Sequence, residues 1–311
     1  MPVISPVSLA YLFRVYRSEI APAANRDTVR RMNELDLNIA YNARKTVLNH
    51  AEISARWDKQ AEQYRSEAIA ELDIAYGNGE REKYDFFPAP GSNENAPVCA
   101  YIHGGYWRSR DRKTFSHIAK GLNERGISVA IPSYDLVPNV TLMSIIGQMR
   151  AFLTRLWSNS NKRPVVAGNS AGGHLAAAML ASDWAAIDGA PDDLVTCGFA
   201  LSGLYDLHPL LNTDINDDVR LDDKSAREAS PVFWAPPREG LKFTAAVGAH
   251  ENGVFKEQSR RLTEVWGEAG IDVEYLEVPD CNHFTIVEAV STPGEMLFER
   301  LVSTVETHDG N

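Results

Sequence analysis

The sequence predicts an α/β protein with a mainly parallel central sheet that is flanked by helices on both faces. Three observations lead to this prediction. Apolar strand-like segments alternate with helical segments from Val98 onward, glycine-rich turns follow two of these strands, and no internal repeat or low-complexity tract is present. With 311 residues, of which 44% are hydrophobic, the chain is long enough to bury a substantial core.

Residues 1–70 are predicted to form a helical N-terminal extension that packs on the core or caps it. Residues 26–70 are rich in charged and helix-forming residues, with apolar positions at the intervals of amphipathic helices. Trp57 and Tyr64 are seven residues apart and can therefore share one helix face. Core packing and a cap over a functional site are the two interpretations of that face.

The apolar segment 6–13 does not have the pattern of a targeting or membrane-spanning sequence. It lacks a preceding basic region, and Arg14 and Arg17 follow it closely. We expect it to pack on the body of the protein or on another subunit, which makes a homo-oligomer one interpretation. The expected location is the cytoplasm.

Residues 71–311 are predicted to form the main domain. Segments 72–76 and 83–87 indicate an antiparallel pair, because Gly77-Asn78-Gly79 between them has turn chemistry. Strands and helices then alternate, as in a parallel sheet. The expected strands are 98–102, 128–132, 164–168, 195–202, 242–248 and 272–278, and the expected helices are 116–125, 141–157, 171–182, 256–269 and 284–303.

The segment 203–240 is predicted to be a loop or a lid-like excursion from this domain. It carries several aspartates and prolines, but these lack the spacing and the glycine of an EF-hand calcium loop. A solvated excursion is therefore the favoured interpretation.

The most informative motif is Gly168-Asn169-Ser170-Ala171-Gly172. An apolar β-branched run precedes it and an alanine-rich helical run follows it. A serine at such a strand-to-helix turn can be held in a strained backbone with its hydroxyl exposed above the sheet. Ser170 is the predicted nucleophile; an ordinary tight turn is the alternative.

A serine nucleophile requires a general base. In the α/β-hydrolase arrangement the chain order is nucleophile, acid and histidine. Among the downstream histidines, His283 lies on a loop that follows strand 272–278 and precedes a helical stretch, which is where this base belongs. The other downstream histidines are His174, His208, His250 and His308.

Two carboxylates can serve as the acid that orients the histidine. Glu251 follows the strand 242–248, just before the strand of the histidine, and this position favours it. Asp206, after the strand 195–202, is the alternative. A solvated loop charge is the structural interpretation of Glu251.

A second glycine turn has the features of an oxyanion hole. The strand 98–102 ends in His103-Gly104-Gly105, where main-chain N–H groups can approach a developing oxyanion closely. The N–H of Ala171 is the other expected donor. Tyr106 and Trp107 follow the turn and are predicted to contact an aromatic substrate, with anchoring of the loop in the core as the alternative.

The chain resembles the kynurenine formamidase (arylformamidase) family of the α/β-hydrolase superfamily. The resemblance covers about residues 38 to 300, and His-Gly-Gly-Tyr-Trp at 103–107 is its most specific part. It implies hydrolysis of an N-formyl arylamide, N-formyl-L-kynurenine, to kynurenine and formate, with Ser170, Glu251 and His283 as triad. Members usually carry aspartate where Glu251 stands. A carboxylesterase acting on small acyl esters, or on another amide, is the alternative. The stretches that carry the resemblance are 76–79, 103–107, 134–138, 168–177, 182–184, 202–207 and 282–284.

Composition excludes several other classes. A net charge of −11 argues against nucleic acid and against an anionic membrane surface as partners. Glycine loops for nucleotides and metal-ligand spacings are absent from the sequence, so no cofactor and no metal are predicted. The three cysteines, Cys99, Cys197 and Cys281, are odd in number and indicate a reducing compartment. Cys281 lies two residues before His283, so a reactive thiol is a second interpretation there.

Overall fold

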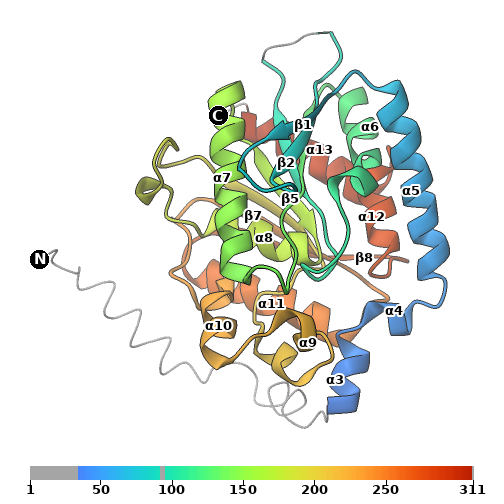
Figure 1. The fold of residues 1–311 in the computed structure, drawn as a ribbon, viewed down its shortest axis with the longest axis vertical. Coiled ribbons are helices and arrows are strands. Elements are labelled where there is room, and N and C mark those ends of the chain that lie inside the picture. Colours follow the sequence, from blue (N-terminus) through green and yellow to red (C-terminus); the bar gives the residue numbers. More distant parts are fainter. Residues whose placement is uncertain (1–33, 92–94, 310–311) are drawn as a thin grey trace, which may run out of the picture.

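The structure is a computed structural model, in which residues 34–91 and 95–309 are described (Figure 1). An eight-stranded sheet forms the centre of this part, in the order β1-β2-β4-β3-β5-β6-β7-β8. β2 runs antiparallel to β1 and β4, and all other neighbouring strands are parallel. The predicted parallel sheet and hairpin are thus confirmed. The strands are β1 (Glu71–Ala75), β2 (Lys83–Phe87), β3 (Val98–Ile102), β4 (Ser128–Pro132), β5 (Val165–Asn169), β6 (Cys197–Leu201), β7 (Lys242–Gly248) and β8 (Asp272–Val278).

The central strands are buried on both faces, which explains their continuous apolar runs. Side chains alternate across a strand, so neighbours in β3 enter different cores. Val98, Ala100 and Ile102 pack into one core, and Cys99 and Tyr101 pack into the other. The sheet therefore separates two hydrophobic cores.

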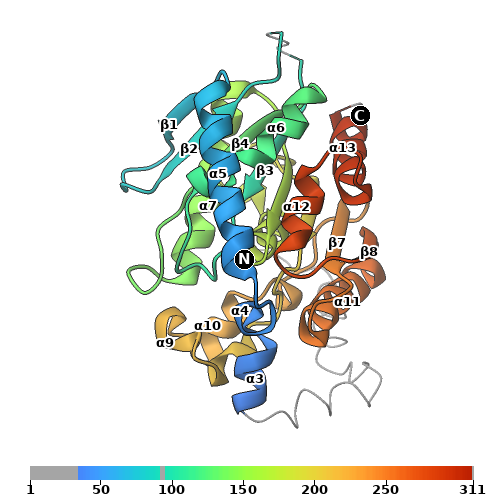
Figure 2. The same ribbon diagram turned by 90° about the vertical axis from the view of Figure 1, so that its right-hand side faces the viewer.

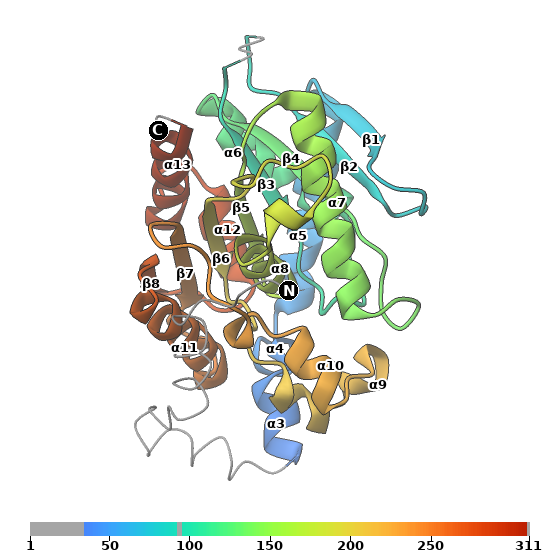
Figure 3. The ribbon, with the colours of Figure 1, turned by 90° about the vertical axis from the view of Figure 1, so that its left-hand side faces the viewer.

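Helices cover both faces, as the alternation of elements predicts. The face with α5, α6, α12 and α13 is turned toward the viewer in Figure 2, and α7 and α8 lie in front of the sheet in Figure 3. The longer helices are α5 (His50–Glu67), α6 (His117–Glu124), α7 (Leu142–Ser160), α8 (Ala171–Leu180), α11 (Gly253–Glu268), α12 (Thr285–Ser291) and α13 (Met296–Asp309).

The single helix predicted over 284–303 is wrong. The chain forms two helices there, α12 and α13, because Pro293-Gly294 interrupts the pattern. Proline cannot donate a backbone hydrogen bond, and Gly294 has a φ of 91° that helical residues do not adopt.

The described part of the N-terminal extension lies beside the main domain. α5 packs against α6 and against a 3₁₀ turn at Arg112–Phe115. Two shorter helices precede α5: α3 (Glu34–Ala40) and α4 (Ala43–Thr46). The predicted arm at 6–13 lies outside the described residues.

The segment 203–240 contains short helices rather than a plain loop. α9 (Asn216–Val219) and α10 (Asp223–Glu228) lie near α3 and α4 at one end of the molecule (Figures 2 and 3). The backbone N–H of Asp214 donates to Asn38 Oδ1 at 2.6 Å, which joins this segment to the extension. A lid role for it stays a prediction.

Candidate active site

Ser170 occupies a sharp turn between β5 and α8. Its φ of 55° and ψ of −117° are rarely adopted by a residue with a side chain, and the turn is held because Ser170 N–H donates to Leu201 O at 2.7 Å. Glycine is required on either side. A Cβ at Gly172 would lie 1.9 Å from Ile102 O, and one at Gly168 would lie 2.5 Å from Gly172 O. The motif therefore forms the strained turn that its spacing predicts.

His283 and Glu251 come together at the ends of the two last strands. His283 Nδ1 lies 2.7 Å from Glu251 Oε2. The other carboxylate oxygen, Oε1, accepts hydrogen bonds from Ser202 Oγ at 2.5 Å and from the Gly248 N–H at 2.7 Å. The Glu251 side chain is only 1% exposed, so these three donors replace the water that it loses on burial. An ionised carboxylate in this position can hold the imidazole in one tautomer.

Asp206, the alternative acid, is engaged elsewhere. Its Oδ1 lies 2.9 Å from His208 Nδ1, and Arg261 donates to its other oxygen. The hydrogen bonds of Asp206 therefore connect it to a different histidine, and the structure brings Glu251 rather than Asp206 to His283.

The glycine turn after β3 lies against the serine turn. Gly104 N–H donates to Asn169 Oδ1 at 3.1 Å, which leaves Gly105 as the glycine whose N–H has no acceptor in 34–91 and 95–309. Gly105 has a φ of 115°, and a Cβ there would lie 2.3 Å from Ser109 O. Ala171 is the first residue of α8, so its N–H has no partner within the helix. The N–H groups of Gly105 and Ala171 are thus the two available donors.

His103 and Asn169 support this turn. The ring of His103 stacks on Tyr134 at 4.4 Å between centroids, and its Nδ1 lies 2.7 Å from Gly104 O. Burial lowers the pKa of His103 to about 4, so the ring is neutral at pH 7. Asn169 Oδ1 also accepts from the Tyr101 hydroxyl at 3.1 Å. The roles of Asn169 and Ser202 were not evident from the sequence, because both depend on contacts between distant segments.

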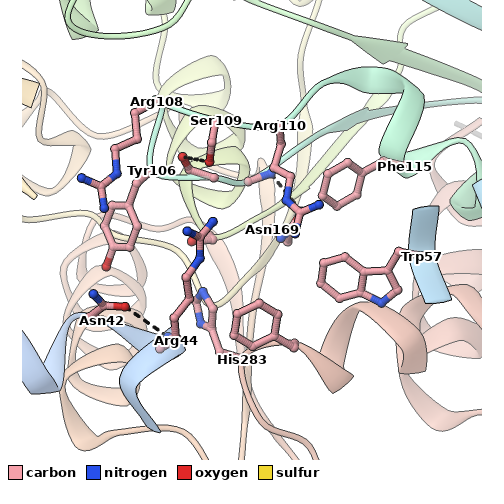
Figure 4. A pocket seen from close by; sticks show the side chains of 15 residues that line it. Asn42, Arg44, Trp57, Tyr106, Arg108, Ser109, Arg110, Phe115, Asn169 and His283 are labelled. Atoms are coloured by element: carbon pink, nitrogen blue, oxygen red, sulfur yellow. Dashed lines mark hydrogen bonds between the residues drawn. The ribbon is translucent and has the colours of Figure 1, made fainter. Parts of the chain in front are cut away.

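Ser170, His283 and the Gly104-Gly105 turn line one cavity, drawn in Figure 4. Aromatic rings form much of its wall: Trp57 of α5 stacks on Phe284 at 5.9 Å, and Phe115 and Tyr106 complete the wall. Trp57 thus serves both core packing and the cavity. The residues that line the cavity are Asn42, Ala43, Arg44, Trp57, Gly104, Gly105, Tyr106, Arg108, Ser109, Arg110, Phe115, Asn169, Ser170, His283 and Phe284.

Trp107 does not line this cavity, so its predicted substrate contact is wrong. With a φ of 55° the chain turns its side chain inward, where it is fully buried and packs edge-on against His174 at 5.0 Å. Tyr106 does line the cavity, and its hydroxyl donates to Tyr41 O. Of the two aromatic residues, one anchors the loop and the other faces the cavity.

Kynurenine formamidases are among the relatives of this chain. It is 27% identical to that of Danio rerio over 250 residues, which cover 78% of this chain and 85% of that protein. It is 29% identical to that of Drosophila melanogaster over 226 residues, covering 69% and 75% of the two chains. The family described as alpha/beta hydrolase fold matches residues 99–230. This chain is an α/β-hydrolase that is related to the kynurenine formamidases.

A solved structure with the same fold has a different name. A crystal structure from Silicibacter sp. TM1040, whose protein is described as a proposed thioesterase, is 32% identical to this chain and has a TM-score of 0.77. The match covers 87% of this chain and 98% of that one. The relatives of this chain are thus named as hydrolases of different bonds: formamide bonds in the kynurenine formamidases and a thioester bond in the Silicibacter protein.

The remaining candidate features do not add chemistry to the site. All three cysteines are buried free thiols, and burial raises the pKa of Cys281, so it stays protonated rather than forming a reactive thiolate. Residues 34–91 and 95–309 hold no group of three His, Cys, Asp or Glu side chains that could bind a metal. None of the described helices is long and apolar enough to cross a membrane.

Three buried histidines predict acid sensitivity. Burial lowers the pKa of His103, His117 and His174 to about 4 from 6.5, so the unfolded chain binds more protons than the folded one below pH 6.5. Their contribution to stability is present above pH 6.5 and is lost as the pH falls toward 4. We expect the free energy of unfolding to drop by on the order of 2 kcal/mol per histidine between pH 6.5 and 5.

Urea denaturation at steps between pH 7 and 5 measures this drop, at values where carboxylates, with pKa values of about 4, still contribute little. His174 donates through Nε2 to Ala229 O at 2.7 Å, so His174→Gln keeps an amide donor but cannot become charged. This variant should show a smaller drop than the parent. Stability that stays constant from pH 7 to 5 would contradict the prediction.

Proposed function

We propose that the protein is a serine hydrolase that cleaves N-formyl arylamides, with N-formyl-L-kynurenine as the expected substrate and kynurenine and formate as products. The observation that carries the proposal is the meeting of Ser170, the His283–Glu251 pair and the Gly104-Gly105 turn at one cavity. The kinship with kynurenine formamidases supports the choice of substrate.

The proposed reaction proceeds through a formyl-enzyme. His283 Nε2 removes the Ser170 proton while the hydroxyl oxygen attacks the formyl carbon. Glu251 accepts the hydrogen bond from Nδ1–H and stabilises the imidazolium that forms. The oxyanion receives hydrogen bonds from the N–H groups of Gly105 and Ala171.

Collapse of the tetrahedral intermediate completes the first half-reaction. His283 returns its proton to the aryl amine nitrogen as the C–N bond breaks, and the formyl group remains on Ser170. Water then attacks the formyl ester with His283 again as the base, which releases formate and regenerates the serine. The aromatic wall around Trp57, Phe115 and Phe284 supports an aromatic leaving group.

The alternative is a carboxylesterase, or an enzyme for another amide or a thioester. Ser170, activated by His283 and Glu251, can attack the carbonyl carbon of any of these substrates. The proposed thioesterase of Silicibacter sp. TM1040 is a relative of this chain. The two functions are therefore distinguished by which bond the enzyme hydrolyses fastest: the formyl arylamide bond, or an ester, another amide or a thioester bond.

A substrate panel tests the proposal. Formate release from N-formyl-L-kynurenine is compared with turnover of N-acetyl-L-kynurenine, p-nitrophenyl acetate and S-phenyl thioacetate. We expect kcat/KM for the formyl arylamide to exceed that for the acetyl arylamide by about 10-fold or more, because one added methyl group must be accommodated at the carbonyl. A kcat/KM for the ester or thioester that exceeds the formamide value would favour the alternative function.

A further inference from the structure

We propose that Arg44 is a specificity-determining residue that binds a carboxylate on the aryl leaving group of the substrate. The proposal rests on the proposed function and adds a charge requirement to it. Three arginines, Arg44, Arg108 and Arg110, line the cavity that holds Ser170 and His283 (Figure 4). In a chain with a net charge of −11, this gathering of positive charge is local to the cavity.

Two of these arginines have partners. Arg108 forms an ion pair with Asp218 at 2.7 Å. Arg110 donates to Ser54 Oγ at 2.7 Å and lies 3.7 Å from Asp58. Each of these two guanidinium groups thus has a partner within the protein.

Arg44 differs from both. Its guanidinium makes no hydrogen bond or ion pair with another residue of 34–91 and 95–309, and the nearby acid Asp214 is paired with Lys45 at 3.3 Å. The backbone around Arg44 is fixed, since Arg44 N–H donates to Asn42 Oδ1 at 3.2 Å. From α4 its side chain points into the cavity (Figure 4). Arg44 therefore presents to the cavity a guanidinium that has no partner among residues 34–91 and 95–309.

A second cation faces the same space. Burial, and in addition the positive charge of Arg44, lower the pKa of Arg110, against the opposing effect of Asp58. An anion bound at Arg44 would relieve this repulsion. A guanidinium matches the two oxygens of a carboxylate, and the aromatic wall beside it fits an aryl ring. The ligand that combines both is an aryl formamide whose ring carries a carboxylate-bearing side chain.

The test compares two formamides that differ in this side chain. N-formyl-L-kynurenine carries the carboxylate, and 2′-formamidoacetophenone has the same aryl formamide without it. We expect Arg44→Gln to raise KM for the charged substrate by about 10- to 100-fold and to leave KM for the neutral one within about 2-fold. Arg44→Lys should recover part of the lost affinity for the charged substrate, because lysine keeps the positive charge but cannot form the bidentate hydrogen bond to a carboxylate.

Lys45→Gln is the matched control, since it removes the same charge from the neighbouring position, outside the cavity lining. It should leave both KM values unchanged. An equal rise of KM for both substrates with Arg44→Gln, or no rise for the charged one, would overturn the proposal. The melting temperature of each variant separates a folding defect from a binding effect.

Acetylsalicylate and phenyl acetate separate this proposal from the proposed function. They differ by one carboxylate on the aryl leaving group and need no formamidase activity. If formamides are not cleaved but these esters are, a selective loss of acetylsalicylate turnover with Arg44→Gln still supports a carboxylate site, and the absence of such a selective loss rejects it.

Discussion

Ser170→Ala is expected to lower kcat by at least about 10³-fold on every substrate that the protein hydrolyses. The hydroxyl oxygen forms the bond to the acyl carbon in the proposed mechanism, and the methyl group of alanine cannot form it. Alanine keeps the Cβ, so the unusual backbone conformation of φ 55° and ψ −117° is unchanged. The melting temperature should therefore stay close to that of the parent.

Ser170→Gly provides the control for the backbone. Glycine also lacks the hydroxyl but adopts positive φ without steric cost, so it should raise stability by about 1 kcal/mol while losing the same activity. Thermal unfolding and initial rates on the same samples distinguish the two effects. Undiminished hydrolysis by Ser170→Ala would show that another group is the nucleophile.

Glu251→Gln is expected to lower kcat by about 10²- to 10⁴-fold. The carboxylate oxygen Oε2 lies 2.7 Å from His283 Nδ1, and an amide there cannot offset the positive charge that the imidazole gains in the transition state. If the amide NH₂ faces Nδ1, it donates to that nitrogen and favours the tautomer in which Nε2 carries the proton, so His283 cannot act as the base.

Asp206→Asn is the matched control, because it also replaces a carboxylate by an amide and lies at the end of the neighbouring strand. Asp206 is bound by His208 and Arg261, so this variant should keep its kcat within about 3-fold. Steady-state kinetics of both variants decide between the acids. A large loss with Asp206→Asn and none with Glu251→Gln would contradict the arrangement that the structure supports.

The sequence was sufficient to predict those features that depend on local pattern. The strands were found because buried parallel strands are continuous apolar runs, and the turn at Ser170 was found because only glycine fits on either side of it. Glu251 and His283 are predicted from the chain order of nucleophile, acid and histidine and from their positions directly after two late strands, and the structure places their side chains 2.7 Å apart.

The errors lie where a residue's role depends on a contact that is distant in the sequence or on a single backbone angle. Trp107 was predicted to face the substrate, but its positive φ turns the ring into the core. The helix at 284–303 was predicted from its apolar periodicity, which continues across Pro293-Gly294 although the hydrogen bonds cannot. Arg44 was missed because nothing near it in the sequence shows that α4 lies at the cavity.

The bond between Gly104 N–H and Asn169 Oδ1 has a consequence for engineering this protein. It joins the turn that holds the proposed oxyanion donor Gly105 to the residue directly before the proposed nucleophile Ser170, and the Tyr101 hydroxyl donates to the same acceptor atom. The turn at 103–105 and the turn at Ser170 are therefore held together by hydrogen bonds to one side chain, that of Asn169. A graft that exchanges the 103–107 loop with that of a relative has to bring along the matching partners at 101 and 169, or the transplanted amides will be out of register with the hydroxyl that they serve.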